Sequence, residues 1–309
     1  MAFDTVLAVS VLGVAAWTIV ARDMFAAVTG FIAFGLLVAL VWVRLAAPDV
    51  ALTEAALGSG LTGGLLLGAS TRFGRAGMTG EPPGAILHLA AVAVCALVAG
   101  GLAVLVLLLP EPAPTLATQA AANIAATGLQ NPVTAVLMAY RAIDTLLEVV
   151  VLLLALFGMW SLAPDHLWNG LPHHHSLSDP DGLLTFVAQL LVPVGILVGI
   201  HIFWIGSVTP GGEFQGATIL SAMWILAAVA GLVDAPATSR SWLRLLLVAG
   251  PAVFFAIGLA GFAIAGGFLA YPASYAKLLI LTIEIPVTLS IAAMLALLVA
   301  GPPEREPQR

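Results

Sequence analysis

The stretch Ala90–Leu109, AAVAVCALVAGGLAVLVLLL, contains no charged residue. An α-helix needs about 20 consecutive apolar residues to cross the hydrocarbon core of a bilayer. A transmembrane β-strand is much shorter and alternates apolar and polar residues, which this stretch does not. It therefore predicts a membrane-spanning helix, and similar runs along the chain predict an all-α polytopic membrane protein.

Composition agrees with this reading. Of 309 residues, 61% are hydrophobic and only 8% are charged, whereas an ordinary soluble domain has roughly 25% charged residues. A water-soluble enzyme of this length is therefore excluded. The net charge of −6 leaves no basic face for nucleic acid.

Hydropathy and helix breakers predict about nine spans, grouped three, two and four. Their ranges are 4–21, 24–43, 50–69, 85–109, 133–160, 182–206, 213–232, 242–269 and 273–300. The segment Ala113–Gly128 between the fourth and fifth spans is expected to form an interfacial helix.

Basic residues between the spans predict the orientation. One side collects Arg22, Arg72, Arg75, Arg240, Arg244, Arg305 and Arg309, and the other has Arg44 and Lys277. Cytoplasmic loops are enriched in Lys and Arg. The N-terminus is therefore expected outside and the C-terminus in the cytoplasm.

Ionisable side chains at bilayer depth are expensive, so each is a functional candidate. Glu54 lies in the third span, next to a glycine-rich face beginning at Gly58. It is either a station on an ion path or a carboxylate near the start of the helix. Asp49, beside Pro48, is expected to serve as the helix cap.

Arg141, Asp144 and Glu148 are spaced by three and four residues. This spacing places all three on one face of a single fifth helix. Arg141 neutralises one carboxylate and leaves a surplus negative charge, so the two carboxylates are expected to titrate as a coupled pair suited to proton exchange. The alternative is a static salt bridge that fixes helix packing.

A turn between the sixth and seventh spans carries a further set of candidates. They are Pro210, Gly211, Gly212, Glu213 and Gln215. Proline and paired glycines favour a tight re-entry, and Gly216 permits close helix approach. Glu213 and Gln215 either line an ion entrance or belong to a structural turn.

Further titratable residues lie in the sixth, ninth and fourth spans. Lys277 and Glu284 are two turns apart on one helix face, and Pro286 frees a backbone carbonyl near Glu284. Glu284 is a candidate ion station, and Lys277 is a candidate for tuning its charge. His201 and His88 are either proton shuttles or packing residues.

Motifs for a bound cofactor or for catalysis are not evident in the sequence. His173–His175 and nearby His166 lie in a loop and do not preform a tetrahedral metal site. Cys95 is the single cysteine, so no cysteine set for a cluster is available. Isolated carboxylates suit protons better than Na⁺, which needs several oxygen ligands. We therefore expect no metal, no cofactor and no catalysis by this chain.

Three motifs carry a resemblance to a known family. Pro48–Leu61 resembles the C-terminal part of the large A subunit of Mrp-type cation/proton antiporters, a module that also occurs as a small separate protein in membrane-bound hydrogenases. Asn131–Glu148 resembles the adjoining E-type module, although Ala142 and Leu147 replace usual glycines. Ser207–Gly216 resembles the Pro-Gly-Gly-Gly-Phe-x-Gly signature of the antiporter B subunit, with Glu213 in place of the third glycine.

The resemblance implies a D-like module over 1–80, an E-like module over 81–165 and a B-like domain over 176–301. The first two together are similar to the J-type subunit of respiratory complex I. It also implies a prokaryotic plasma-membrane subunit that contributes carboxylates to a proton or Na⁺ path. The implied partners are large antiporter-like subunits, a small C-type subunit and, in some assemblies, a hydrogenase or other redox arm.

Two other functions stay open from the sequence. In one, the chain is a structural scaffold of the same complex and its charges only hold helices together. In the other, it is an independent transporter of small solutes, which predicts inverted repeats.

Overall fold

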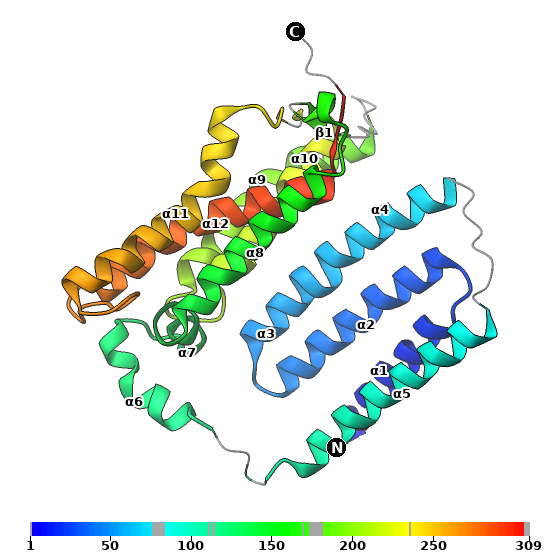
Figure 1. Ribbon diagram of the computed structural model, residues 1–309, viewed down its shortest axis with the longest axis horizontal. Coiled ribbons are helices and arrows are strands. Elements are labelled where there is room, and N and C mark those ends of the chain that lie inside the picture. Colours follow the sequence, from blue (N-terminus) through cyan, green and yellow to red (C-terminus); the bar gives the residue numbers. More distant parts are fainter. Residues whose placement is uncertain are drawn as a thin grey trace.

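Figure 1 shows the computed structural model, which describes residues 2–75, 84–110, 112, 115–168, 170–172, 182–234 and 236–305. The described part of the chain is almost entirely helical, and its two short strands pair antiparallel near the C-terminus. The predicted all-α membrane fold is therefore confirmed.

The N-terminal helices form one layer, seen at the lower right of Figure 1. They are α1 (Ala2–Val20), α2 (Met24–Arg44), α3 (Pro48–Thr53), the π-helix η1 (Glu54–Leu61) and α4 (Thr62–Arg75). Asp23 begins α2, because its side chain accepts a hydrogen bond from the Ala26 amide. The segments α3, η1 and α4 continue one another, so the third predicted span is one helix with a π-helical centre.

The middle of the chain contains one long helix and several short ones. These are α5 (Ala85–Leu108), α6 (Ala117–Thr127), α7 (Pro132–Ala135), the π-helix η2 (Val136–Tyr140) and α8 (Ala142–Trp160). A helix, α6, is present in the segment predicted to be interfacial, and Gly128, with a left-handed φ of 69°, caps its C-terminal end. Its position at the membrane surface stays a prediction. No residue of α5 is buried within this chain.

The C-terminal part is a bundle in which α12 is central. Its elements are η3 (Asp165–Leu167), β1 (Leu171–Pro172), α9 (Leu183–Ile205), α10 (Glu213–Val229), α11 (Ser241–Ile264), α12 (Ala276–Ala300) and β2 (Pro303–Arg305). Helix α12 packs against α8, α10 and α11. Ile283, Val287 and Ile291 of α12 are fully buried, so a polar residue on the same face of this helix is held inside the bundle.

Eight described helices are long and apolar enough to cross a membrane. The remaining predicted span corresponds to α10, which has 17 residues. The count of nine and the orientation of the termini stay predictions.

Helices α9 and α10 approach each other closely at Gly216. A Cβ atom at this position would lie 2.8 Å from the Phe203 Cβ and 2.9 Å from the Gly199 carbonyl oxygen. We expect Gly216→Ala to lower the stability of the protein by about 1–3 kcal/mol through this overpacking. Thermal unfolding in detergent measures the change.

Gly13→Ala is the matched control, since nothing lies within 4 Å of its added Cβ. Equal melting temperatures for the two variants would contradict the close approach of α9 and α10.

Candidate functional site

A tight turn brings the start of α10 back against the end of α9. Gly211 and Gly212 have φ angles of 145° and 133°, which residues with a side chain rarely adopt. A Cβ at Gly211 would lie 2.5 Å from the Ile202 carbonyl oxygen, and the Gly212 amide donates a hydrogen bond to that oxygen at 3.1 Å. The two glycines therefore make the turn possible and set the position of Glu213.

Glu213 begins α10 inside the protein. Only 5% of the residue is exposed, and among the described residues neither of its carboxyl oxygens has a hydrogen-bond partner. A buried charge without partners is strongly disfavoured, so such a group holds a proton or gains a partner from the cavity it faces.

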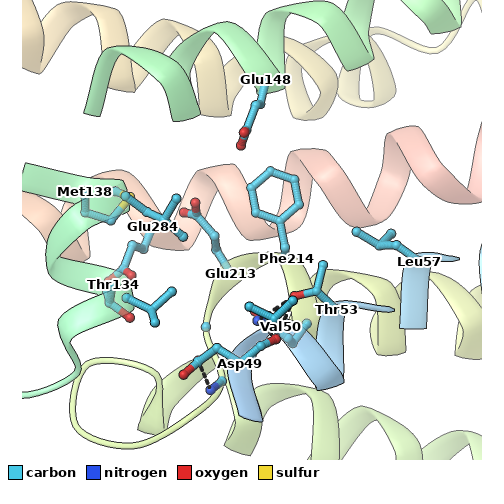
Figure 2. Close-up of a pocket in the computed structure, with 15 residues that line it drawn as sticks. Asp49, Val50, Thr53, Leu57, Thr134, Met138, Glu148, Glu213, Phe214 and Glu284 are labelled. Atoms are coloured by element: carbon cyan, nitrogen blue, oxygen red, sulfur yellow. Dashed lines mark hydrogen bonds between the residues drawn. The ribbon is translucent and has the colours of Figure 1, made fainter. Parts of the chain in front are cut away.

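That cavity has a volume of about 400 Å³ and lies between the N-terminal layer and the C-terminal bundle. Its described lining residues are Asp49, Val50, Thr53, Leu57, Val133, Thr134, Leu137, Met138, Glu148, Gly211, Gly212, Glu213, Phe214, Gln215 and Glu284. We call it the carboxylate cavity, because four of these described lining residues are acidic and none is basic. In Figure 2, the Glu148 side chain extends from α8 in the direction of Glu213.

Glu284 lines both the carboxylate cavity and a second cavity of about 360 Å³. This second cavity is lined by Lys277, Glu284 and the turn residues Ser207–Thr209, among others. Glu284 is itself buried, with 5% of the residue exposed. The predicted proximity of Lys277 and Glu284 on one face of α12 is thus found, and a single carboxylate borders both spaces.

Asp49 holds three segments together, a role that the sequence analysis missed. Its Oδ1 atom accepts hydrogen bonds from Asn131 Nδ2 at 3.2 Å and from the Gly211 amide at 3.0 Å. Its backbone carbonyl accepts one from Gln215 Nε2 at 3.4 Å. The predicted capping role was wrong: the cap of α3 is Ala47, without a side-chain hydrogen bond, and Asp49 turns toward the middle and C-terminal segments instead.

The predicted grouping of Arg141, Asp144 and Glu148 is found in part: Asp144 and Glu148 lie one turn apart on α8, but the predicted single fifth helix is interrupted at Arg141. The π-helix η2 ends at Tyr140, and the next residue, Arg141, interrupts the fifth span with a φ of −130° and a ψ of 35°. Arg141 pairs with Asp144 through largely solvent-exposed side chains, and neither is among the residues that line the carboxylate cavity. Glu148, one turn farther along α8 than Asp144, is the member of this group that lines the cavity.

The other candidates lie apart from this cavity. The Glu54 carboxyl group lies beside Gly58 of its own π-helix and Gly35 of α2, where it would meet a Cβ atom added at either glycine. His201 and His88 are exposed on α9 and α5, and Pro210 lines a separate space beside Asp49. The structure therefore unites Glu148, Glu213 and Glu284, but not Glu54 or Asp144.

Among the described residues, no three His, Cys, Asp or Glu side chains are placed to hold a metal ion. His166 lies in η3. The triplet His173–His175 falls outside the described residues.

Two family models match the chain. MbhD, a component of MBH, matches residues 9–75, and a domain related to the MnhB subunit of the Na⁺/H⁺ antiporter matches residues 183–301. Neither extends over residues 76–182, so the E-like module stays a prediction. An uncharacterised protein of Methanocaldococcus jannaschii is 29% identical over 156 residues, which make up 46% of this chain and 60% of that protein.

Solved structures show the same fold. The Mrp complex from Dietzia sp. DQ12-45-1b matches with a TM-score of 0.74 and 25% identity, covering 98% of this chain and 35% of that chain. The membrane-bound sulfane sulfur reductase, an archaeal respiratory membrane complex, matches in fold with a TM-score of 0.52 and 23% identity over 69% of this chain and 98% of that chain. This chain thus spans less than two thirds of the Methanocaldococcus and Dietzia relatives.

These matches agree with the family that the three motifs resemble. The chain is a multi-pass membrane protein of the Mrp/Mbh type, with an MbhD domain and an MnhB-related domain joined in one polypeptide.

Proposed function

We propose that this chain provides part of a proton path in an Mrp-type cation/proton antiporter or a related redox-driven complex. The carboxylate cavity carries this proposal, because Glu148, Glu213 and Glu284 come from three helices into one space without a basic lining residue among those described. Acidic groups within membrane-spanning helices are costly unless they take up protons or cations. Lys277 borders the second cavity together with Glu284, and we propose that its positive charge favours the ionised form of Glu284.

Protons fit this cavity better than Na⁺ does. A cation site needs several oxygen ligands arranged around one point, and among the described residues no three His, Cys, Asp or Glu side chains are placed to hold an ion. A proton path requires only titratable groups that water can connect, and a space of about 400 Å³ has room for water. Na⁺ is then exchanged elsewhere in the complex.

The exposed apolar surface of this chain supports a role beside partner subunits. Helix α5 buries none of its residues in this chain although it is long and apolar. Exposed apolar helix surfaces in a membrane face either lipid or other helices. We infer that the chain works as a non-catalytic subunit without a cofactor of its own, beside large antiporter-like subunits, a small C-type subunit and, in some assemblies, a redox arm.

A scaffold role is the second candidate, and the contacts of Asp49 favour it. One carboxylate links α3 to Asn131 and Gly211, which is the arrangement expected of a chain that holds modules together. Transport would then run through the partners alone.

Purification through a C-terminal tag in mild detergent, with mass spectrometry of the co-purifying proteins, tests the subunit role. We expect antiporter-like subunits to co-purify, with cluster-bearing subunits added if the complex is redox-driven. The purified complex in proteoliposomes should change the internal pH when a cation gradient or an electron donor is applied. A chain that purifies alone and monodisperse would contradict the proposal.

A further inference from the structure

We propose that Glu213 relays protons between Glu284 and Glu148. This relay rests on the proposed function and names the order in which residues carry the proton.

The first argument is the surroundings of the Glu213 carboxyl group. The residue is more than nine-tenths buried, and both oxygens lack a hydrogen-bond donor among the described residues. A structural carboxylate of this depth would be expected to accept hydrogen bonds from a neighbouring amide, hydroxyl or cation. Asp49 shows the contrast, because the same cavity borders it and its Oδ1 atom accepts two hydrogen bonds.

The second argument is the position of Glu213 between the other acidic groups. Glu284 of α12 and Glu148 of α8 line the same cavity and lie close enough to interact electrostatically with Glu213. Glu284 also borders the second cavity, whereas the Glu148 side chain is exposed in this chain. A proton entering beside Lys277 therefore meets Glu284, Glu213 and Glu148 in that order.

Tyr271 is a further titratable group near Glu213, in the connection between α11 and α12. Its hydroxyl group is buried without a described hydrogen-bond partner. Burial, and then the negative charge of Glu213, raise the pKa of Tyr271. The hydroxyl group thus keeps its proton and remains available as a donor to Glu213 or to water.

The transfer steps balance without a further reactant. Protonated Glu284 gives its proton through water to ionised Glu213, and protonated Glu213 then gives a proton to ionised Glu148. Each step breaks one O–H bond and forms another. Glu284 then takes a new proton from water in the second cavity, and Glu148 releases its proton to water on its exposed side, so the net change is one proton moved between the two sides. The opposite direction uses the same groups.

The test uses the purified complex in proteoliposomes with a pH-sensitive dye. Glu213→Gln should reduce the rate of pH change by about tenfold or more, since glutamine cannot bind and release a proton. Glu213→Gly should lose the same activity, and it needs no space for a new side chain, so assembly should be kept. The exposed acidic residue Asp165 provides the control variant Asp165→Asn, which should transport at the wild-type rate.

Infrared difference spectra between two pH values give a second readout. The wild-type complex should show a carboxylic acid C=O band, sensitive to D₂O, that disappears in Glu213→Gln. Wild-type transport and an unchanged spectrum in either assembled Glu213 variant would overturn the relay. If Glu148→Gln is inactive while the Glu213 variants are fully active, only the relay fails; if Glu148→Gln is also fully active, the proposed proton path fails as well.

Discussion

Replacing Glu148 by glutamine should abolish proton transport while the complex still assembles. Glutamine has nearly the same shape as glutamate but cannot carry a proton between water and the cavity. Glu148 is the acidic side chain of α8 that lines the carboxylate cavity, so no neighbour on that helix can replace it there. Positioned acid–base groups contribute about 10²–10⁴-fold to proton-transfer rates, and we expect cation-dependent pH change in proteoliposomes to fall to the background level.

Asp144→Asn is the matched control, one turn earlier on the same helix. Asp144 pairs with Arg141 through solvent-exposed side chains, and exposed ion pairs contribute about 0–1 kcal/mol. This variant should therefore assemble and transport at close to the wild-type rate. Full transport by Glu148→Gln would exclude its role in the path. If Asp144→Asn then failed to assemble, the scaffold function would become the better explanation.

The helical part of the fold was predictable because each span is a long apolar run. The hairpin of α1 and α2 follows directly from two such runs around Arg22 and Asp23. The π-helices η1 and η2 were not predictable, because the hydropathy of Val136–Tyr140 is the same in a π-helix and an α-helix. As a consequence, the break at Arg141 was missed, and the single unbroken helix assigned to the fifth span was wrong.

The site was predictable only residue by residue. Glu148, Glu213 and Glu284 each stood out as acidic groups in apolar runs, but their meeting in one cavity depends on how α8, α10 and α12 pack. Glu54 stood out equally and lies elsewhere, against Gly35 and Gly58. Hydropathy identifies which charges are buried in a membrane and gives no information on which of them share a space.

Asp49→Ala should loosen the N-terminal layer from the rest of the protein. The substitution removes the acceptor of the Gly211 amide and one acceptor of Asn131 Nδ2. A buried donor left without an acceptor costs about 1–3 kcal/mol, and here the loss falls on the turn that positions Glu213. We expect a lower melting temperature in detergent and a smaller yield of intact complex after purification.

Asp49→Asn distinguishes a structural role from a role in transport. Asparagine keeps an oxygen acceptor at the Oδ1 position, so both hydrogen bonds can remain and stability should change by about 1 kcal/mol or less. The control Asp4→Ala removes an acidic side chain whose pair with Arg44 is solvent-exposed, and it should leave the melting temperature unchanged. We expect Asp49→Asn to transport normally, because Asp49 acts through geometry and not through proton exchange. An Asp49→Asn complex that assembles but does not transport would show instead that Asp49 is a fourth station in the proton path.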